Sequence, residues 1–381
     1  MRGGHENSIG DTMRSINVLL KPASSACNMD CKYCFYKSVS ASRETPFTGM
    51  MSFETLECVV RKVLDAAESG CGFAFQGGEP TLAGLDYYRH FIELVKRYNT
   101  RNIRVSCSIQ TNGYVIDKEW AEFFNKNSFL VGLSIDGCSE VHNQNRIDNF
   151  GKPTFNTVMK AARFLKEYKV DFNILSVVTG PSARHVTKNY EFLKRQGFRH
   201  LQFIPYLEPQ GSEKGSSNDN LSPLNYSIFL SNLFDLWYRD LIRDDYVSIR
   251  HFENLVGMMK GLSPESCNMS GACTCQYVIE GDGGVYPCDF YVLDSHRLGN
   301  INTDSLKEMF ESGNCQTFIT SSAIVPDKCR NCRFHLLCRN GCRRDRVHQD
   351  GDAPLNYYCD ANREFFARTY DRLLEISGRL I

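Results

Sequence analysis

Three cysteines near the start of the chain have a spacing suited to chemistry at a metal. Cys27, Cys31 and Cys34 form the pattern CxxxCxxC, directly after the apolar run Ile16 to Leu20. Three thiolates can hold a cubane iron-sulfur cluster and leave its fourth iron open to another ligand. A structural zinc site would be closed by a fourth protein ligand at short range, and none lies nearby. The triplet therefore predicts a [4Fe-4S] cluster with an open iron, although thiols packed or paired in a loop would share this spacing.

A second and larger group of cysteines lies towards the C-terminus. Ten of the 17 cysteines fall between Cys267 and Cys359, in a stretch that reads as loop-rich. Zinc is the simpler interpretation of CRNCRFHLLC, because an isolated CxxC most often binds that metal. Two zinc ions or two further iron-sulfur clusters would each account for so many thiols.

Composition narrows the class of protein. Lys plus Arg and Asp plus Glu both number 44, so no net charge favours nucleic acid or an anionic membrane as a partner. No apolar stretch is long enough to cross a bilayer, and residues 1–14 lack the apolar centre of a signal peptide. We therefore expect a cytoplasmic protein with reduced thiols and neither nucleic-acid nor membrane partners.

Alternating patterns predict the elements that position the first cysteines. Apolar, β-branched runs alternate with amphipathic stretches, as in βα units around a parallel sheet. The expected strands are Ile16 to Leu20, Gly72 to Gln76, Ile103 to Ile109, Leu130 to Ile135, Phe172 to Val178 and Leu201 to Pro205. The expected helices are Phe53 to Ala67, Tyr87 to Tyr98, Lys118 to Asn125, Phe155 to Tyr168 and Val186 to Gln196. Six such units are too few for a complete eight-stranded barrel and indicate an open one.

Chemically distinctive residues follow the carboxyl ends of these strands, where loops of a βα barrel gather into one mouth. Gly77 and Gly78 leave the backbone uncrowded beside Glu79, where a ligand's amino group could approach. The cysteine triplet, Gln110 to Gly113, Ser134 with Asp136 and Gly137, and Leu207 occupy equivalent places after other strands. We expect one shared site at this mouth.

The pattern changes after Leu207. Residues 208–221 read as a linker, Asn225 to Arg243 as a helix, and Tyr277 to Pro287 as a β-hairpin. We therefore expect a flexible leader at 1–14, a barrel with linker and following helix at 15–245, and a cysteine-rich domain with a C-terminal helix at 246–381.

CNMDCKYCFY, GGEP, QTNG and LSIDG together resemble the radical S-adenosylmethionine superfamily, over nearly everything from Ile16 to Leu207. The resemblance implies an α/β fold, a partial (β/α)6 TIM-like barrel, with S-adenosylmethionine on the open iron. The later cysteines resemble the SPASM domain of peptide-modifying members, which carries two further clusters. Position by position, this resemblance assigns Cys267, Cys273, Cys288 and Cys342 to one cluster and Cys329, Cys332, Cys338 and Cys359 to the other, making three [4Fe-4S] clusters in all. The role of Cys275 stays open. Arg339, Arg343, Arg344 and Arg346 would balance the clusters' negative charge, with RNA binding as an alternative.

KPASSACNMDCKYCFY, FAFQGGEPTLAG, FLVGLSIDG, ARHV and YPCDFYVLD resemble the anaerobic sulfatase-maturating enzymes along almost the whole chain. The resemblance implies oxidation of a Cys or Ser, in a CxPxR-type motif of a sulfatase polypeptide, to Cα-formylglycine without oxygen. A 5′-deoxyadenosyl radical would remove a Cβ hydrogen, and Asp289 matches the general base. Tyr33, Gly78, Ser134, Arg146 and Leu207 match contacts to S-adenosylmethionine. A flavodoxin- or ferredoxin-type protein would supply electrons. Another SPASM enzyme, forming a thioether or crosslink, is the alternative.

Overall fold

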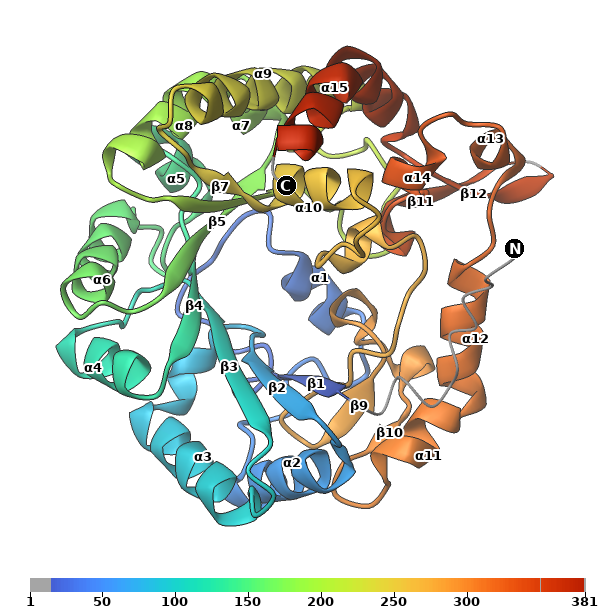
Figure 1. The fold of residues 1–381 in the computed structure, drawn as a ribbon. Coiled ribbons are helices and arrows are strands. Elements are labelled where there is room, and N and C mark those ends of the chain that lie inside the picture. The colour runs from blue at the N-terminus through green and yellow to red at the C-terminus, as the bar shows by residue number, and fades with distance from the viewer. Residues whose placement is uncertain (1–14, 350, 380–381) are drawn as a thin grey trace.

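Six parallel strands form the centre of the computed structural model, which describes residues 15–349 and 351–379. In sheet order they are β1 (Ser15–Leu20), β2 (Gly70–Phe75), β3 (Arg104–Thr111), β4 (Phe129–Ser134), β5 (Phe172–Val178) and β6 (His200–Pro205). Figure 1 shows these strands curving around a common centre with helices on the outside. The predicted α/β partial barrel is confirmed. The predicted leader, residues 1–14, lies outside the described residues.

The outer helices are close to the predicted ones. They are α2 (Phe53–Ala66), α3 (Leu85–Tyr98), α4 (Lys118–Lys126), α6 (Phe155–Glu167) and α8 (Val186–Arg195). Two of them begin where a side chain accepts a backbone N–H: Ser52 from Thr55, and Asp117 from Trp120. The structure adds α1 (Phe35–Ala41), η2 (Pro80–Ala83), α5 (Ser139–Asn145) and α7 (Gly180–Ala183). Elements this short carry too little periodicity to be predicted.

Aromatic packing joins the sheet to its outer helices. Phe73 and Phe75 of β2 are almost fully buried. Their rings lie 5.2 and 5.0 Å from that of Phe91 on α3, both edge to face. Burial of each such side chain stabilises the fold by roughly 1.5–3 kcal/mol. This aromatic layer lies between the sheet and its outer helices. The polar residues lie at the carboxyl ends of the strands.

The C-terminal half extends the same sheet at both edges. β7 (Ser248–Ile249) pairs parallel to β6, and β8 (Val278–Ile279) pairs parallel to β1. β8 and β9 (Gly284–Tyr286) form the predicted hairpin, and β10 (Gly299–Asn300) completes that edge. The remaining elements are α9 (Pro223–Ile242), α10 (Arg250–Met259), η3 (Cys267–Met269), η4 (Asp289–Tyr291), η5 (Asp294–His296), α11 (Leu306–Glu311), α12 (Gly313–Ser322), α13 (Asp327–Arg330), α14 (His335–Cys338), η6 (Arg343–Asp345), β11 (Arg346–Gln349), β12 (Asp352–Asn356) and α15 (Cys359–Arg379).

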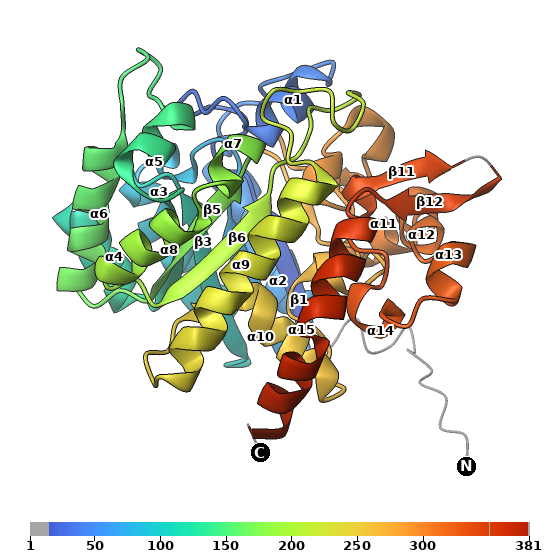
Figure 2. The ribbon, with the colours of Figure 1, turned by 90° about the horizontal axis from the view of Figure 1, so that it is seen from above.

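The C-terminal helix returns to the barrel. α15 runs beside α9 in Figures 1 and 2, and its Phe365 ring lies 5.9 Å from that of Phe234 on α9. The same ring stacks on Phe252 of α10 at 6.0 Å. Sheet and core therefore continue across the expected boundary between residues 245 and 246, which stays a prediction.

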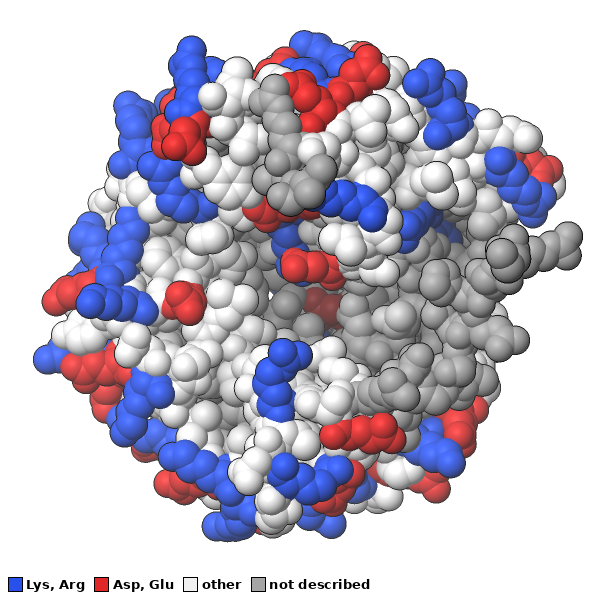
Figure 3. All heavy atoms as spheres, in the orientation of Figure 1, with Lys and Arg blue, Asp and Glu red and all other residues white. Residues whose placement is uncertain are grey.

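Charges of both signs are interspersed around the face shown in Figure 3, as the equal numbers of acids and bases suggest. Across residues 15–349 and 351–379, no helix has the length and apolar character required to span a membrane.

Replacement of Gly281 by alanine tests the seating of the hairpin. A Cβ at Gly281 would lie 2.1 Å from the carbonyl oxygen of Gly49, so the hairpin must move away from the barrel loop. We expect a loss of about 1–3 kcal/mol in stability, measured as a lower melting temperature of the anaerobic holoprotein. Gly313→Ala is the control, because a Cβ there meets nothing within 4 Å. Equal melting temperatures for the two variants would contradict this packing.

Candidate active site

The cysteine triplet lies on the loop after β1, and backbone hydrogen bonds join this loop to the glycines after β2. Gly78 N donates to Ser24 O at 2.8 Å, and Glu79 N donates to Ala26 O at 2.8 Å. A Cβ at Gly78 would lie 2.0 Å from Ala26 O, so this close approach requires glycine. The two loops therefore form one rigid unit at the barrel mouth.

The first thiols are partly buried and surrounded by donors. Met29 N and Asn112 Nδ2 lie 3.4 and 3.7 Å from Cys27 Sγ. Burial raises the pKa of Cys27 to about 12 and that of Cys31 to about 11. These thiols therefore need a cationic partner to ionise, and iron in a cluster is such a partner. The donor set fits the predicted cluster.

Glu79 holds loops together. Its carboxylate accepts hydrogen bonds from Thr81 N and Oγ1, Thr111 Oγ1 and Asn112 N, at 2.6–3.1 Å. Burial raises its pKa, although these donors oppose the shift. Both carboxylate oxygens are engaged by the protein, which leaves the neighbouring backbone, and not this acid, to face a ligand.

Two predicted S-adenosylmethionine contacts meet at one buried carboxylate. The Tyr33 hydroxyl donates to Asp136 Oδ2, and Arg146 Nε donates to the same oxygen at 3.1 Å. The Arg146 guanidinium also lies 5.3 Å from the centroid of the Tyr33 ring. Asp136 Oδ1 accepts from Val177 N at 3.1 Å. The carboxylate thus fixes both side chains beside the triplet.

The other predicted contacts lie at the same strand ends. Ser134 ends β4 and accepts from Gln110 Nε2 at 3.1 Å. Leu207 follows β6 and is half-buried. With Gly78 after β2, these positions surround the mouth, as the barrel rule predicts. Their contact with S-adenosylmethionine stays a prediction.

Asp289 reaches this mouth from the cysteine-rich region. It begins η4 directly after Cys288, and its Oδ1 lies 2.5 Å from Lys21 Nζ at the end of β1. Its Oδ2 accepts from Gln76 Nε2 at 2.8 Å. The Lys21 side chain is fully buried and that of Asp289 is 10% exposed, so water screens this pair little.

Sequence reasoning missed Lys21 and two residues behind it, Arg43 and Glu280. Lys21 Nζ lies 3.7 Å from the centroid of the Tyr36 ring, whose hydroxyl donates to Glu280 on the hairpin. Glu280 Oε1 lies 3.0 Å from Arg43 Nη1, and both side chains are buried. Burial opposes ionisation of Glu280, but Lys21 and Arg43 hold its pKa below the ordinary value. A lysine directly after an apolar strand was the available signal.

The later cysteines lie in two groups, and their role as cluster ligands stays a prediction. Cys342 lies near enough to Cys267 and Cys273 for their charges to raise its pKa, after the larger effect of burial. The pKa of Cys288 is likewise raised by burial first and then by the charges of Cys342 and Cys267. In the other group, burial raises the pKa of Cys338 most, and the charges of Cys359 and Cys329 raise it further.

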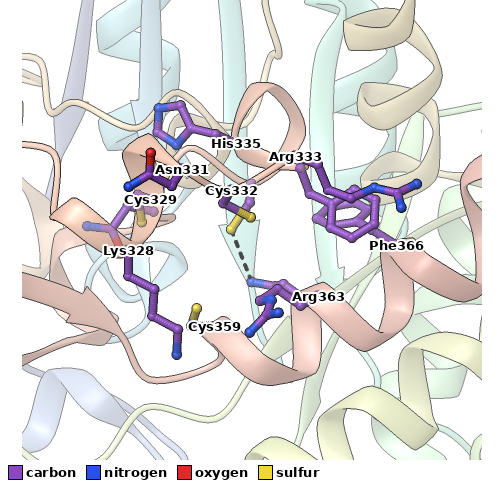
Figure 4. Close-up of a pocket in the computed structure, with 13 residues that line it drawn as sticks. Lys328, Cys329, Asn331, Cys332, Arg333, His335, Cys359, Arg363 and Phe366 are labelled. Atoms are coloured by element: carbon purple, nitrogen blue, oxygen red, sulfur yellow. Dashed lines mark hydrogen bonds between the residues drawn. The ribbon is translucent and has the colours of Figure 1, made fainter.

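A cavity of about 390 Å³ separates the thiols of Cys329, Cys332, Cys338 and Cys359. The labelled cysteines point into one open space in Figure 4, with Lys328 and Arg363 at its edge. Within the described residues, no three His, Cys, Asp or Glu side chains are arranged around a single metal ion. The spread of these thiols fits a polynuclear cluster, with Lys328 and Arg363 beside its negative charge.

Cys275 has a different partner from its neighbours. Its thiol lies beside that of Cys315, which is fully buried on α12, and this neighbour raises the pKa of Cys275. Cys288 also influences the pKa of Cys275, so Cys275 lies near that group while its main partner is Cys315.

The late arginines brace the cysteine-rich loops. Arg346 donates to the backbone oxygens of Ser322, Gly271, Gly341 and Asn340, at 2.6–3.1 Å. Arg344 Nη2 donates to Glu208 O at 2.7 Å, and Arg343 Nη1 donates to Phe318 O at 2.9 Å. These guanidinium groups serve the fold, which disfavours the RNA-binding alternative for this run.

An open parallel barrel, a three-cysteine loop at its mouth and two cysteine groups beyond define a radical S-adenosylmethionine enzyme with auxiliary clusters. The model of the radical SAM superfamily matches residues 22–193, and that of an iron-sulfur cluster-binding domain, SPASM, matches residues 267–333.

Relatives that align with nearly the whole chain define the kind of radical S-adenosylmethionine enzyme more closely. The chain is 48% identical to a cysteine-type anaerobic sulfatase-maturating enzyme of Clostridium perfringens, over 97% of this chain and all of that protein. It is 31% identical to a serine-type enzyme of Bacteroides thetaiotaomicron, over 93% of this chain and 89% of the relative. The solved structure of native anSMEcpe with bound AdoMet and Kp18Cys peptide has a TM-score of 0.92 and 48% identity, covering 96% of this chain and all of that one. The chain belongs to the family of anaerobic sulfatase-maturating enzymes.

Adjacent cysteines provide a matched test of the predicted ligands. Three clusters contain about twelve irons per chain, and loss of one cluster leaves about eight. We expect Cys273→Ala to lower reconstituted iron to that level, because Cys273 lies in the group of Cys267 and Cys342. Cys275→Ala should keep all the iron, because its thiol is directed to Cys315. Iron and sulfide analysis measures both variants. Iron loss from Cys275→Ala alone would reverse the assignment.

Proposed function

We propose that this enzyme oxidises a cysteine of a sulfatase polypeptide to Cα-formylglycine under anaerobic conditions. The observation that carries the proposal is the buried Asp289 carboxylate, held by Lys21 and Gln76 at the mouth that the cysteine triplet shares. The family supports this substrate class. Cysteine is favoured over serine because the cysteine-type relative is 48% identical and the serine-type relative 31%.

The residues proposed for the cofactors are those that the family resemblance assigns, and their positions in the fold support the assignment. Cys27, Cys31 and Cys34 would hold the first cluster, and Tyr33, Gly78, Ser134, Arg146 and Leu207 would contact S-adenosylmethionine. Cys267, Cys273, Cys288 and Cys342, and separately Cys329, Cys332, Cys338 and Cys359, would hold the others. When bound, the reduced first cluster and S-adenosylmethionine supply a 5′-deoxyadenosyl radical that removes a hydrogen atom from the substrate Cβ.

Asp289 is the proposed general base. To become a thioaldehyde, the substrate must lose a proton and an electron as well as that hydrogen atom, and the cluster that Cys288 would help to hold could accept the electron. Water then hydrolyses the thioaldehyde to the aldehyde and releases sulfide. The Asp289 carboxylate can accept the proton, and its hydrogen bond from Gln76 and ion pair with Lys21 hold it in place. Its position after Cys288 ties it to a predicted cluster ligand.

The electron donor and location complete the proposal. A flavodoxin- or ferredoxin-type carrier is supported by Lys328, Arg333 and Arg363, which line the cavity among the last four cysteines and would complement an acidic protein. A cytoplasmic location is supported by the 17 cysteines, all of them free thiols.

A peptide assay tests the proposed reaction. Anaerobic enzyme with reconstituted clusters, S-adenosylmethionine and a reductant should convert a CxPxR-type peptide to an aldehyde, detected by mass spectrometry. An otherwise identical peptide with Ala in place of the target Cys is the control. Formation of 5′-deoxyadenosine with a thioether or crosslink in place of the aldehyde would favour the alternative SPASM chemistry.

Asp289→Asn tests the proposed base. The variant keeps the size of the side chain but cannot accept a proton at a carboxylate, so we expect about 100-fold less aldehyde while 5′-deoxyadenosine still forms. Both products are quantified in one reaction by liquid chromatography. Asp294→Asn, five residues along at an exposed position, is the control and should retain native yield. Full aldehyde yield from Asp289→Asn would remove Asp289 from the mechanism.

A further inference from the structure

Four buried charges connect the hairpin to the proposed base. Lys21 and Arg43 are the cations, and Glu280 and Asp289 are the anions, so the group as a whole is neutral. The side chains of Lys21, Arg43 and Glu280 are at most 1% exposed. Buried charges need opposite partners, so each of the four depends on the others.

The Tyr36 ring lies between the two halves of this group. Its centroid is 3.7 Å from Lys21 Nζ and 5.7 Å from the Arg43 guanidinium, and its hydroxyl donates to Glu280. Glu280 therefore sets the orientation of the ring on which Lys21 rests. Lys21 in turn contacts Asp289 Oδ1. This gives an unbroken chain of contacts from Glu280 to Asp289.

The hairpin end of the chain is itself firmly held. Glu280 Oε2 accepts from Thr48 Oγ1 at 3.0 Å, and the next residue, Gly281, packs against the backbone of Gly49. Arg43 Nη2 donates to Pro46 O at 2.6 Å, which anchors its guanidinium in the same loop. Glu280 thus transmits the position of this loop to the active-site mouth.

We propose that Glu280 is a positioning residue for Asp289 and acts through Tyr36 and Lys21. This inference rests on the proposed role of Asp289. Without the Glu280 charge, the group keeps two buried cations, Lys21 and Arg43, near one ring but has a single anion, Asp289. Lys21 then shifts from the ring, and the carboxylate of Asp289 shifts with it.

Glu280→Gln tests the inference, since it keeps the side-chain size and an oxygen for the Tyr36 hydroxyl but removes the charge. We expect native iron content, native formation of 5′-deoxyadenosine and an unchanged KM for the peptide. The aldehyde formed per 5′-deoxyadenosine should fall about tenfold, because a misplaced group lowers only the step that it serves. A native ratio, or equal losses of both products, would overturn the proposal.

Asp240→Asn is the matched control, because it also breaks a buried ion pair. Asp240 on α9 lies 2.6 Å from Lys194 on α8, and its side chain is 3% exposed. This variant should lower the melting temperature and leave the product ratio unchanged. A changed ratio here would show that any loss of a buried pair uncouples the reaction, and would overturn the specific role of Glu280.

Tyr36→Phe provides a second route if Glu280→Gln does not fold. It removes the hydroxyl that links the ring to Glu280 and should lower the product ratio to a similar extent. The double variant should be no worse than either single variant, because both act through one chain. Additive losses would contradict that chain.

A crystal structure of the Glu280→Gln holoprotein separates this inference from the proposed function. We expect the distance from Lys21 Nζ to Asp289 Oδ1, 2.5 Å in the native protein, to lengthen. An unchanged distance would overturn the inference even if the native enzyme forms the aldehyde. A lengthened distance would support it even if the native enzyme forms another product.

Discussion

The pairing of β8 with β1 is the constraint on which the rest of the site depends. Leu19 N donates to Tyr277 O at 3.2 Å, and Lys21 N donates to Ile279 O at 2.8 Å. These bonds bring the hairpin, and with it Cys288 and Asp289, to the strand that leads into the cysteine triplet. A parallel pair of this kind joins segments more than 250 residues apart and sets their relative register.

Burial of charge then determines how the mouth is organised. Asp136 accepts hydrogen bonds from Tyr33 and Arg146. Glu79 accepts hydrogen bonds from the loops after β2 and β3. Glu280 pairs with Arg43 and accepts a hydrogen bond from Tyr36. Each carboxylate is buried and surrounded by donors, since an unpaired one would cost several kcal/mol. Three acids therefore act as fixed points for the loops at the mouth, where Asp289, held by Lys21 and Gln76, is the proposed base.

Much of the fold and part of the candidate site could be predicted from the amino-acid sequence. The six strands and five outer helices have strong periodicity, so their positions were predicted to within a few residues. The two later cysteine sets and Asp289 came from resemblance, because spacing alone also allows zinc. Short elements such as α1 and α5 were missed, and so were Lys21, Arg43 and Glu280. Their importance lies in contacts between distant segments, which no local pattern records.

The sequence by itself determined the α/β barrel and the triplet at its mouth, because hydrophobic periodicity and ligand spacing are local properties of the chain, and the resemblance of its motifs indicated the family. Only the tertiary structure decided which buried cation faces Asp289. It also placed the Cys275 thiol beside that of Cys315. The reason is physical: the energy of a buried charge or thiol depends on what surrounds it in three dimensions, and those neighbours come from other parts of the chain.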